Sequence, residues 1–276
     1  MQQEPLKQTF TNRHFTWRYT RENRPSGALA GTSHYDESMV ITYLIHGTGT
    51  LWVEGHTTPI QEGDLLLLNP NEFHRCFFDA HPQHERLSIY LHSSLAESFC
   101  VSSDSLFAAF LKRPLGQWNV IPGAFLHEQQ IDSLLLSMKY PALDDEDAAV
   151  VLQCQVVQLL RLLNHTMQQM QAGPQYSVTN KTVSRAIEHI NRHLTEELST
   201  AAIAKALFVD KSYLCRVFKT YTGATLSDYI SKKRIDYATK LIANGLSRTE
   251  ACYKSGFGNY SSFYRYYQRY KKSEHS

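Results

Sequence analysis

The chain has 276 residues, of which 42% are apolar and 20% are charged, and its net charge is +2. This composition excludes a mainly disordered chain, and the length predicts two domains that each bury a core. The longest apolar runs are too short to cross a bilayer, and residues 1–10 are polar rather than signal-like. We therefore expect a cytoplasmic protein with no membrane contact.

Short strands are predicted between residues 39 and 92. β-Branched and aromatic residues there are interrupted by turn-forming residues such as Gly47, Gly55 and Pro70. The segments 39–46, 50–54 and 64–68 have the clearest strand patterns. Many short strands separated by turns predict an antiparallel sandwich or a small barrel.

A long helix is predicted between residues 144 and 170, because apolar residues recur there at intervals of three and four. The stripe consists of Leu152, Val156, Leu159, Leu163, Met167 and Met170. Val157, Leu160 and Leu162 add apolar surface beside the stripe. A second copy of the chain could cover this surface, and an ordinary wide core face is the alternative interpretation.

Residues 171–177 contain a Gly-Pro break without periodicity and are the predicted linker. The predicted domains are thus residues 1–170 and 178–276. In the second domain every pattern is helical: Thr179 or Asn180 can cap a first helix, Ser199 or Thr200 a second, and a long helix spans about 226–243. The predicted fold class is therefore α+β, with a β domain followed by an all-α domain.

The C-terminal part is strongly basic. From Ser177 onward, 17 Lys and Arg stand against 8 Asp and Glu, a net of +9, whereas the earlier residues carry 11 against 18, a net of −7. This asymmetry predicts that only the C-terminal part binds a polyanion. A solvated basic face is the alternative.

An internal repeat lies in this basic part: residues 204–219 match residues 252–268. Each copy has a small residue, Ala204 or Cys252, where two helices can cross, then a tight connection and a second helix with one apolar face. This is the pattern of a helix-turn-helix. The polar faces of the two second helices carry side chains suited to phosphates and base edges. These candidate DNA-binding residues are Lys211, Ser212, Arg216 and Lys219 in the first copy, and Asn259, Tyr260, Ser261, Ser262, Arg265 and Arg269 in the second.

The region from about Ile190 to Tyr270 resembles the AraC/XylS-type transcription regulators. The motifs are Leu198-Ser199, Ile203-Ala204, Ser212-Tyr213-Leu214-x-Arg216-x-Phe218-Lys219, Tyr221-Thr222-Gly223, Arg234, Ala238 and Gly256-Phe257-x-Asn259-x-Ser261-x-Phe263-x-Arg265. The resemblance implies that the long helix joins two recognition helices, which enter successive major grooves of DNA. Ala251-Cys252 replaces the family's Ile-Ala, so we expect looser packing in the second helix-turn-helix.

Glycines and prolines at predicted strand ends, together with His74, also resemble the family's sensor half, a cupin-like barrel that binds a small ligand and dimerises through a helix. An aromatic face or polar tip near the barrel mouth marks the candidate effector-binding residues. These are His34, Tyr43, Trp52, His74 and Tyr90. Ordinary core residues are the alternative for each, and a sugar is the effector that the analogy suggests.

A metal-dependent cupin enzyme with a basic appendage is one alternative function. Cupin metal sites need three or four convergent ligands, and only His74 fits such a set. We predict no metal, no cofactor and no enzymatic activity, since no nucleophile elbow or phosphate-binding Gly loop occurs. The second alternative is a ligand-free regulator controlled by protein partners.

The five cysteines are scattered without a C-x-x-C pair, which indicates reduced thiols. Taken together, these patterns predict a homodimeric transcription activator. We expect it to bind double-stranded promoter DNA, respond to a small molecule and contact RNA polymerase.

Overall fold

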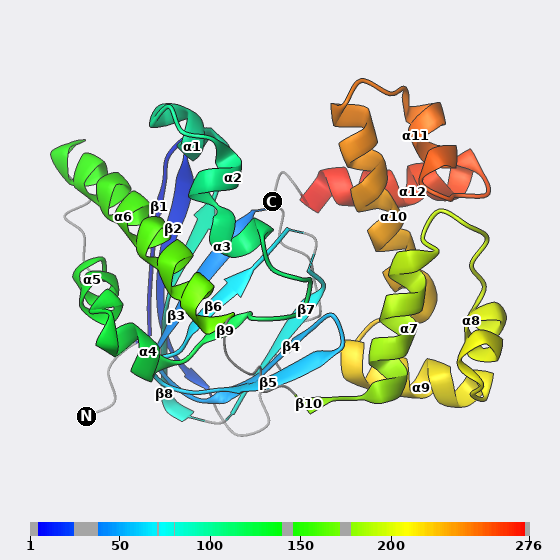
Figure 1. The fold of residues 1–276 in the computed structure, drawn as a ribbon, viewed down its shortest axis with the longest axis horizontal. Helices are drawn as coiled ribbons and strands as arrows, with labels where there is room; N and C mark the ends of the chain where they lie inside the picture. The colour runs from blue at the N-terminus through cyan, green and yellow to red at the C-terminus, as the bar shows by residue number, and fades with distance from the viewer. Residues whose placement is uncertain are drawn as a thin grey trace. The chain divides into compact units, whose positions relative to one another are not determined.

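The computed structural model describes residues 5–24, 38–70, 72–79, 81–139, 146–171 and 178–273 (Figure 1). The chain divides into two compact units, one of Met1–Val53 and Thr57–Val178, the other of Glu54–His56 and Thr179–Ser276. The first unit contains β-sheet and helices, and the second contains helices α7 to α12, which confirms the predicted two-domain α+β layout. Of the predicted linker, all residues except Gln171 lie outside the described part of the chain.

The strands are β1 (Leu6–Thr11), β2 (Phe15–Arg24), β3 (Met39–His46), β4 (Gly49–Val53), β5 (His56–Ile60), β6 (Leu65–Leu68), β7 (His74–Phe78), β8 (His81–Leu91), β9 (Val120–Ile121) and β10 (Val178–Thr179). The helices of the first unit are α1 (Ser94–Ser98), α2 (Ser103–Leu106), α3 (Ala108–Leu111), α4 (Gly123–Glu128), α5 (Ile131–Ser137) and α6 (Glu146–Met170). Those of the second unit are α7 (Lys181–Arg192), α8 (Thr200–Leu207), α9 (Lys211–Thr222), α10 (Leu226–Ala243), α11 (Arg248–Lys254) and α12 (Tyr260–Ser273).

Two antiparallel sheets form the centre of the first unit. The larger has the strand order β1-β2-β8-β3-β6-β9, and the smaller contains β5, β4 and β7 in that order. The three strands with the clearest sequence patterns, β3, β4 and β6, begin and end within one residue of their predicted bounds. The predicted sandwich or barrel of short antiparallel strands is confirmed.

The larger sheet is buried on both faces, and each face has its own apolar core. One face carries Ile41, Tyr43 and Ile45 of β3 and packs against the helices, and the long helix α6 runs along it (Figure 1). The opposite face carries Val40 and Leu44, which pack against side chains of the smaller sheet. We call this second face the inner face, because it lies between the two sheets.

Helix α6 is anchored to the first of these cores. Five members of the predicted stripe are buried, and Met170 is partly buried. Leu160 is also fully buried, and Val157 and Leu162 pack against the same core at partial exposure. The ordinary wide core face therefore accounts for these three residues, and the exposed apolar residues of α6 are instead Val150 and Val151 near its start.

A buried ion pair ties the β6–β7 connection to the segment before β9. Both side chains of Glu72 and Arg113 have 0% exposure, and the guanidinium donates from Nη1 to Oε1 at 2.7 Å and from Nη2 to Oε2 at 2.6 Å. The carboxylate also accepts from the backbone amides of Asn69 and Gly116 and from the Asn119 amide. Each acceptor oxygen is thus hydrogen-bonded, which offsets the cost of burying the charges.

Replacing Arg113 with Ala leaves Glu72 buried without its counter-charge, so we expect the free energy of unfolding to fall by about 3–5 kcal/mol. Urea-induced unfolding measures this change. The neighbouring Lys112 is exposed, and Lys112→Ala should change the same quantity by less than about 0.5 kcal/mol. The double variant Glu72→Met/Arg113→Met should regain most of the loss. A double variant as unstable as Arg113→Ala contradicts an uncompensated charge as the cause.

The second unit begins each helix with a side-chain cap. Asn180 caps α7 by accepting from the amides of Thr182 and Val183, and Ser199 caps α8 by accepting from Ala202. Asp210 and Thr225 cap α9 and α10, while Ser247 and Glu250 form a capping box at α11. Each cap satisfies amide groups that a helix start leaves unpaired. Helix α10 has the predicted bounds, and Asn244-Gly245 follows it.

The α7–α8 connection contacts both α10 and the turn between α11 and α12. Arg234 of α10 donates from Nε to the carbonyl of Leu194 at 2.9 Å and from Nη2 to the carbonyl of Glu196 at 2.6 Å. Gly256, in the turn between α11 and α12, packs against the same connection. A Cβ there would lie 2.8 Å from the Leu194 oxygen and 2.9 Å from the Thr195 Cα, and the residue has φ +90°. Only Gly fits both this space and this backbone conformation.

Gly256→Ala should lower the free energy of unfolding by about 1–3 kcal/mol, because it adds a left-handed non-Gly residue and a backbone clash. Gly258 is a matched control two residues away, since a Cβ there meets nothing within 4 Å. Thermal unfolding of the two Ala variants measures the difference. Equal losses in both variants argue against the close approach at Leu194 as the cause.

Candidate DNA interface and effector site

The second helix of the first repeat, α9, presents the predicted polar face to solvent. Leu214 and Phe218 have 0% exposure and Val217 is half-buried, so the apolar face packs as predicted. The candidate DNA-binding residues on this helix are all exposed, namely Lys211, Ser212, Arg216 and Lys219. Two cations one turn apart, Arg216 and Lys219, therefore lie beside small polar groups, an arrangement that suits a phosphate backbone and base edges.

The second helix of the second repeat, α12, has a similar division. Phe263 and Tyr267 are buried in a core with Ala251 and Cys252, and Tyr266 packs against this core at partial exposure. Of the candidates, Asn259, Ser261, Arg265 and Arg269 are exposed, and Tyr260 and Ser262 are half-buried. Ala251 and Cys252 both have 0% exposure, so this pair lies inside the core of the second repeat.

Asn259 has a structural contact of its own. Its side-chain oxygen accepts from the backbone amide of Ser262 at 2.8 Å, at the start of α12. Tyr260 stacks on Tyr264 and lies against Phe263. Among the α12 residues whose burial is described, the exposed arginines are Arg265 and Arg269, each of which also lies near the Tyr266 ring.

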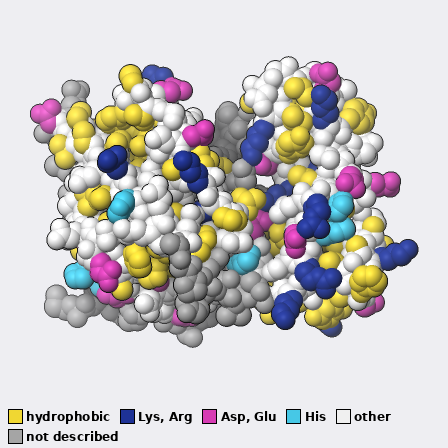
Figure 2. All heavy atoms as spheres, in the orientation of Figure 1, with side chains coloured by type: hydrophobic (Ala, Val, Ile, Leu, Met, Phe, Trp, Pro, Cys, Tyr) yellow, Lys and Arg dark blue, Asp and Glu magenta, His cyan; other side chains and the backbone are white. Residues whose placement is uncertain are grey.

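Lys and Arg side chains are distributed over the helical unit on the face that Figure 2 displays.

The turn between α8 and α9 contains a strained apolar residue: Phe208 adopts φ +57° and is 91% exposed. A non-Gly residue in the left-handed region costs free energy, and this side chain recovers little of it through packing.

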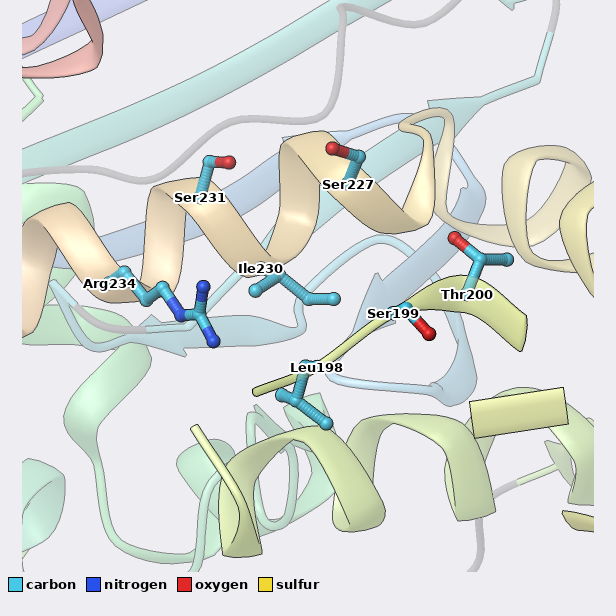
Figure 3. A pocket seen from close by; sticks show the side chains of 7 residues that line it. All are labelled: Leu198, Ser199, Thr200, Ser227, Ile230, Ser231 and Arg234. Carbon is cyan, nitrogen blue, oxygen red and sulfur yellow. The ribbon is translucent and has the colours of Figure 1, made fainter. Parts of the chain in front are cut away.

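A hollow of about 180 Å³ lies between α10 and the segment leading into α8 (Figure 3). Its lining residues are Leu198, Ser199, Thr200, Ser227, Ile230, Ser231 and Arg234. Ser199 already caps α8, and Arg234 already holds the α7–α8 connection. Binding pockets for small molecules usually have about 300–1,000 Å³. We assign this hollow to the packing of the helices.

In the first unit, two of the candidate effector-binding residues share the inner face. Tyr90 of β8 packs against the core between the sheets. His74 of β7 lies opposite Val53, which is part of this core, and directly paired residues of antiparallel strands lie on one face. His74 has 2% exposure, and its Nδ1 lies 2.9 Å from the carbonyl of Glu72.

The other three candidates lie elsewhere. Tyr43 belongs to the core beneath the helices, where burial, with the nearby charges of Asp132 and Glu62, raises the pKa of its phenol. Trp52 alternates with Leu51 and Val53 of the inner core, so it lies on the opposite face of β4, edge-on to Phe73. His34 lies outside the residues that the structure describes.

Sequence reasoning missed the polar side chains of the inner face. Phe15, Trp17 and Tyr19 of β2 pack beneath the helices, which places Thr16, Arg18 and Thr20 on the inner face. Arg18 lies opposite Ser88 and donates to the hydroxyl of Tyr90 at 3.3 Å. The alternation of aromatic and polar residues from 15 to 20 is the sequence signal that could have found this strand and its Arg.

A second cation of the inner face is already paired. Arg86 of β8 lies opposite Leu44 and donates to the Glu22 carboxylate at 2.9 Å. Its guanidinium also lies over the Phe78 ring. The hydroxyls of Thr42 and Ser88 bond to each other at 3.1 Å. Among the described residues, the inner face thus combines hydroxyls and aromatic rings with Arg86, which pairs with a carboxylate, and Arg18, which does not.

Among the described residues, no group of three or more His, Cys, Asp or Glu is placed to hold a metal ion. None of the described helices has the length and apolarity to span a membrane. All five cysteines are free thiols, and burial raises the pKa of Cys252, which disfavours its reactive thiolate.

Comparison with protein families covers both units. The AraC-like ligand binding domain family matches residues 19–198, well over half of the chain. The chain belongs to the AraC/XylS-type family of transcription regulators. A further match, to a helix-turn-helix domain family, covers residues 203–273 and includes both repeats.

Curated relatives match this AraC/XylS-type regulator over about a third of its length. A response regulatory protein of Staphylococcus epidermidis is 26% identical over 88 residues, which are 32% of this chain and 35% of that protein. An HTH-type transcriptional regulator of Pseudoalteromonas carrageenovora is 30% identical over 89 residues, 32% of this chain and 53% of that protein. The regulator HptR of Staphylococcus aureus is 25% identical over 88 residues, with coverages of 32% and 35%. The chain therefore spans between a third and about half of the length of these relatives.

Among solved structures, ToxT of Vibrio cholerae with a bound unsaturated fatty acid is similar over 94% of this chain and 92% of its own. The sequence identity is 12% and the TM-score is 0.42. A second ToxT crystal form has 15% identity, a TM-score of 0.39 and coverages of 93% and 94%.

Proposed function

We propose that this AraC/XylS-type regulator binds promoter DNA sequence-specifically through α9 and α12. One observation carries the proposal: two similarly built helix-turn-helix units, joined by α10, each present an exposed polar and basic helix face. Such a helix fits the major groove, and two units on one face of a duplex read sites about one helical turn apart, near 34 Å. The uneven charge of the chain supports the same assignment.

Arg216 of α9 and Arg265 of α12 are the side chains that we assign to base edges. An Arg can donate two hydrogen bonds to guanine, so each Ala variant should weaken binding at the specific site by about 1–3 kcal/mol. Fluorescence anisotropy of the full chain, with the DNA upstream of its own gene and with scrambled DNA, measures this change. An equal loss on both DNAs would assign the Arg to phosphate instead.

Lys219 is the corresponding phosphate contact. Lys219→Ala should weaken binding to both DNAs alike and reduce the slope of log K against log salt by about one. Arg161 on α6, an exposed Arg of the other unit, is the matched control, and Arg161→Ala should change neither quantity. If the unmodified chain shows no salt-sensitive affinity for any duplex, the proposed function fails.

The effector site that we propose is the inner face of the first unit, with Tyr90, His74 and the hydroxyls of Thr42 and Ser88. Its side chains combine hydrogen-bonding tips with aromatic surface, as small-molecule sites do. A sugar, which the family analogy suggests, would use the hydroxyls. Ligand binding would shift the population between DNA-competent and DNA-incompetent arrangements, which requires different affinities for the two.

We also propose that α6 mediates a homodimer. Val150 and Val151 are 61% and 57% exposed, and Cys154 is exposed one turn later. Apolar side chains that gather on one exposed helix face indicate an interaction surface. The active form would thus be a dimer in the cytoplasm. This dimer would activate transcription through contact with RNA polymerase and would carry out no enzymatic chemistry.

Val151→Asp places a charge in the proposed interface, so we expect the dimer to dissociate to monomers at micromolar concentration. Light scattering coupled to size exclusion gives the mass directly. Gln168, exposed near the other end of α6, is the control position, and Gln168→Asp should leave the dimer intact. A monomeric unmodified chain under the same conditions refutes the interface.

A further inference from the structure

Arg18 is a cation of the inner face whose charge has no partner. Its side chain is half-buried, and its Nε atom is buried without a hydrogen-bond partner. Within the described part of the chain, its one polar side-chain contact is with Tyr90, whose hydroxyl accepts from Nη1 and whose ring lies 5.0 Å from the guanidinium carbon. No carboxylate there pairs with Arg18.

Two other arginines of the first unit have a carboxylate partner. Arg113 is held by Glu72, and Arg86 by Glu22. A half-buried guanidinium is costly to hold without a counter-charge, because burial removes part of its hydration. The guanidinium of Arg18 therefore lacks, among the described residues, the counter-charge that an external anion would supply.

The neighbours of Arg18 fit the charge of that anion. Ser88 lies directly opposite Arg18 on β8, and Thr42 and Tyr90 offer further neutral hydroxyls. Since Glu22 neutralises Arg86, Arg18 is the cation of the described inner face that remains without a counter-charge. One guanidinium with neutral donors suits a monoanion such as a carboxylate, whereas a phosphate dianion calls for more cations.

The surroundings also fit the remainder of an organic acid. Cys76, Phe78 and the ring of Tyr90 pack, partly buried, against the apolar core between the sheets. Atoms next to the carboxylate would therefore meet apolar and aromatic surface. A sugar offers no charge to Arg18 and presents hydroxyls to this surface.

We propose that the effector is an organic monocarboxylate whose carboxylate pairs with Arg18. This inference rests on the proposed effector site and deepens it. The Arg18 guanidinium binds the carboxylate, and the Tyr90 hydroxyl, now hydrogen-bonded to the guanidinium, holds that group in place.

The test is a thermal-shift series on the full chain with paired probes: hexanoate, decanoate and benzoate, each beside its neutral amide, with arabinose and glucose as the sugar arm. At least one carboxylate should raise Tm while its amide does not, because binding to the folded state stabilises it. Titration calorimetry then gives Kd. Arg18→Gln should weaken that Kd by about ten- to a hundredfold, and Arg18→Lys by less. Arg161→Gln on α6 is the control and should leave it unchanged.

A second measurement separates a binding role from a structural one. Without ligand, Arg18→Gln should keep or raise the Tm, since no ion pair is lost, and should keep its affinity for promoter DNA. A lowered ligand-free Tm identifies Arg18 as structural and overturns the proposal. So does a panel in which no carboxylate shifts Tm, or in which a sugar or amide shifts it equally. These results leave the DNA-binding function intact, whereas loss of DNA binding by the unmodified chain removes that function itself.

Discussion

The spacing of the two recognition helices depends on how Arg234 holds the α7–α8 connection. Its two donations to the carbonyls of Leu194 and Glu196 fix α10 to the first helix-turn-helix unit. Gly256 brings the second helix-turn-helix against the same stretch of backbone. Residues 194–196 therefore contact both α10 and the second helix-turn-helix, and α10 separates the two recognition helices. Recognition of two neighbouring grooves requires this kind of fixed separation, because the DNA repeat is itself fixed.

Two arginines of the first unit differ in how their charge is balanced. Arg113 meets Glu72 in a bidentate pair whose remaining acceptor sites are taken by backbone and amide donors. Such a network holds a loop in one arrangement. Arg18, by contrast, has only a phenol and its ring as partners among the residues that the structure describes. An incomplete network in a folded protein is a usual mark of a functional position, since stability alone would not retain it.

The sequence predicted an element best where capping and turn residues mark the same boundaries as the spacing of its apolar residues. Helix α10 has its predicted bounds because Thr225 caps its start and Asn244-Gly245 follows its end. The face of Tyr43 could not be predicted, because β3 is buried on both sides: alternate residues pack against helices or against the second sheet, and most are apolar. Strand β2 was missed although its aromatic and polar residues alternate from Phe15 to Thr20. The proposed role of Arg18 depends on the lack of a carboxylate partner among the described residues. Only the tertiary structure reveals this lack.

The size of the Arg18 contribution limits what the effector can do. A charged hydrogen bond is worth about 1.5–3 kcal/mol, or roughly ten- to a hundredfold in affinity. A complete switch from 1:99 to 99:1 needs about 10⁴-fold preference for one state. The ion pair alone therefore gives a graded response. A sharper response requires that the apolar remainder of the ligand also favours one arrangement, for which Phe78 and Cys76 on the inner face are placed. The hollow beside Arg234 is lined by groups that already hold the helices together, so we assign the proposed preference to the inner face of the first unit.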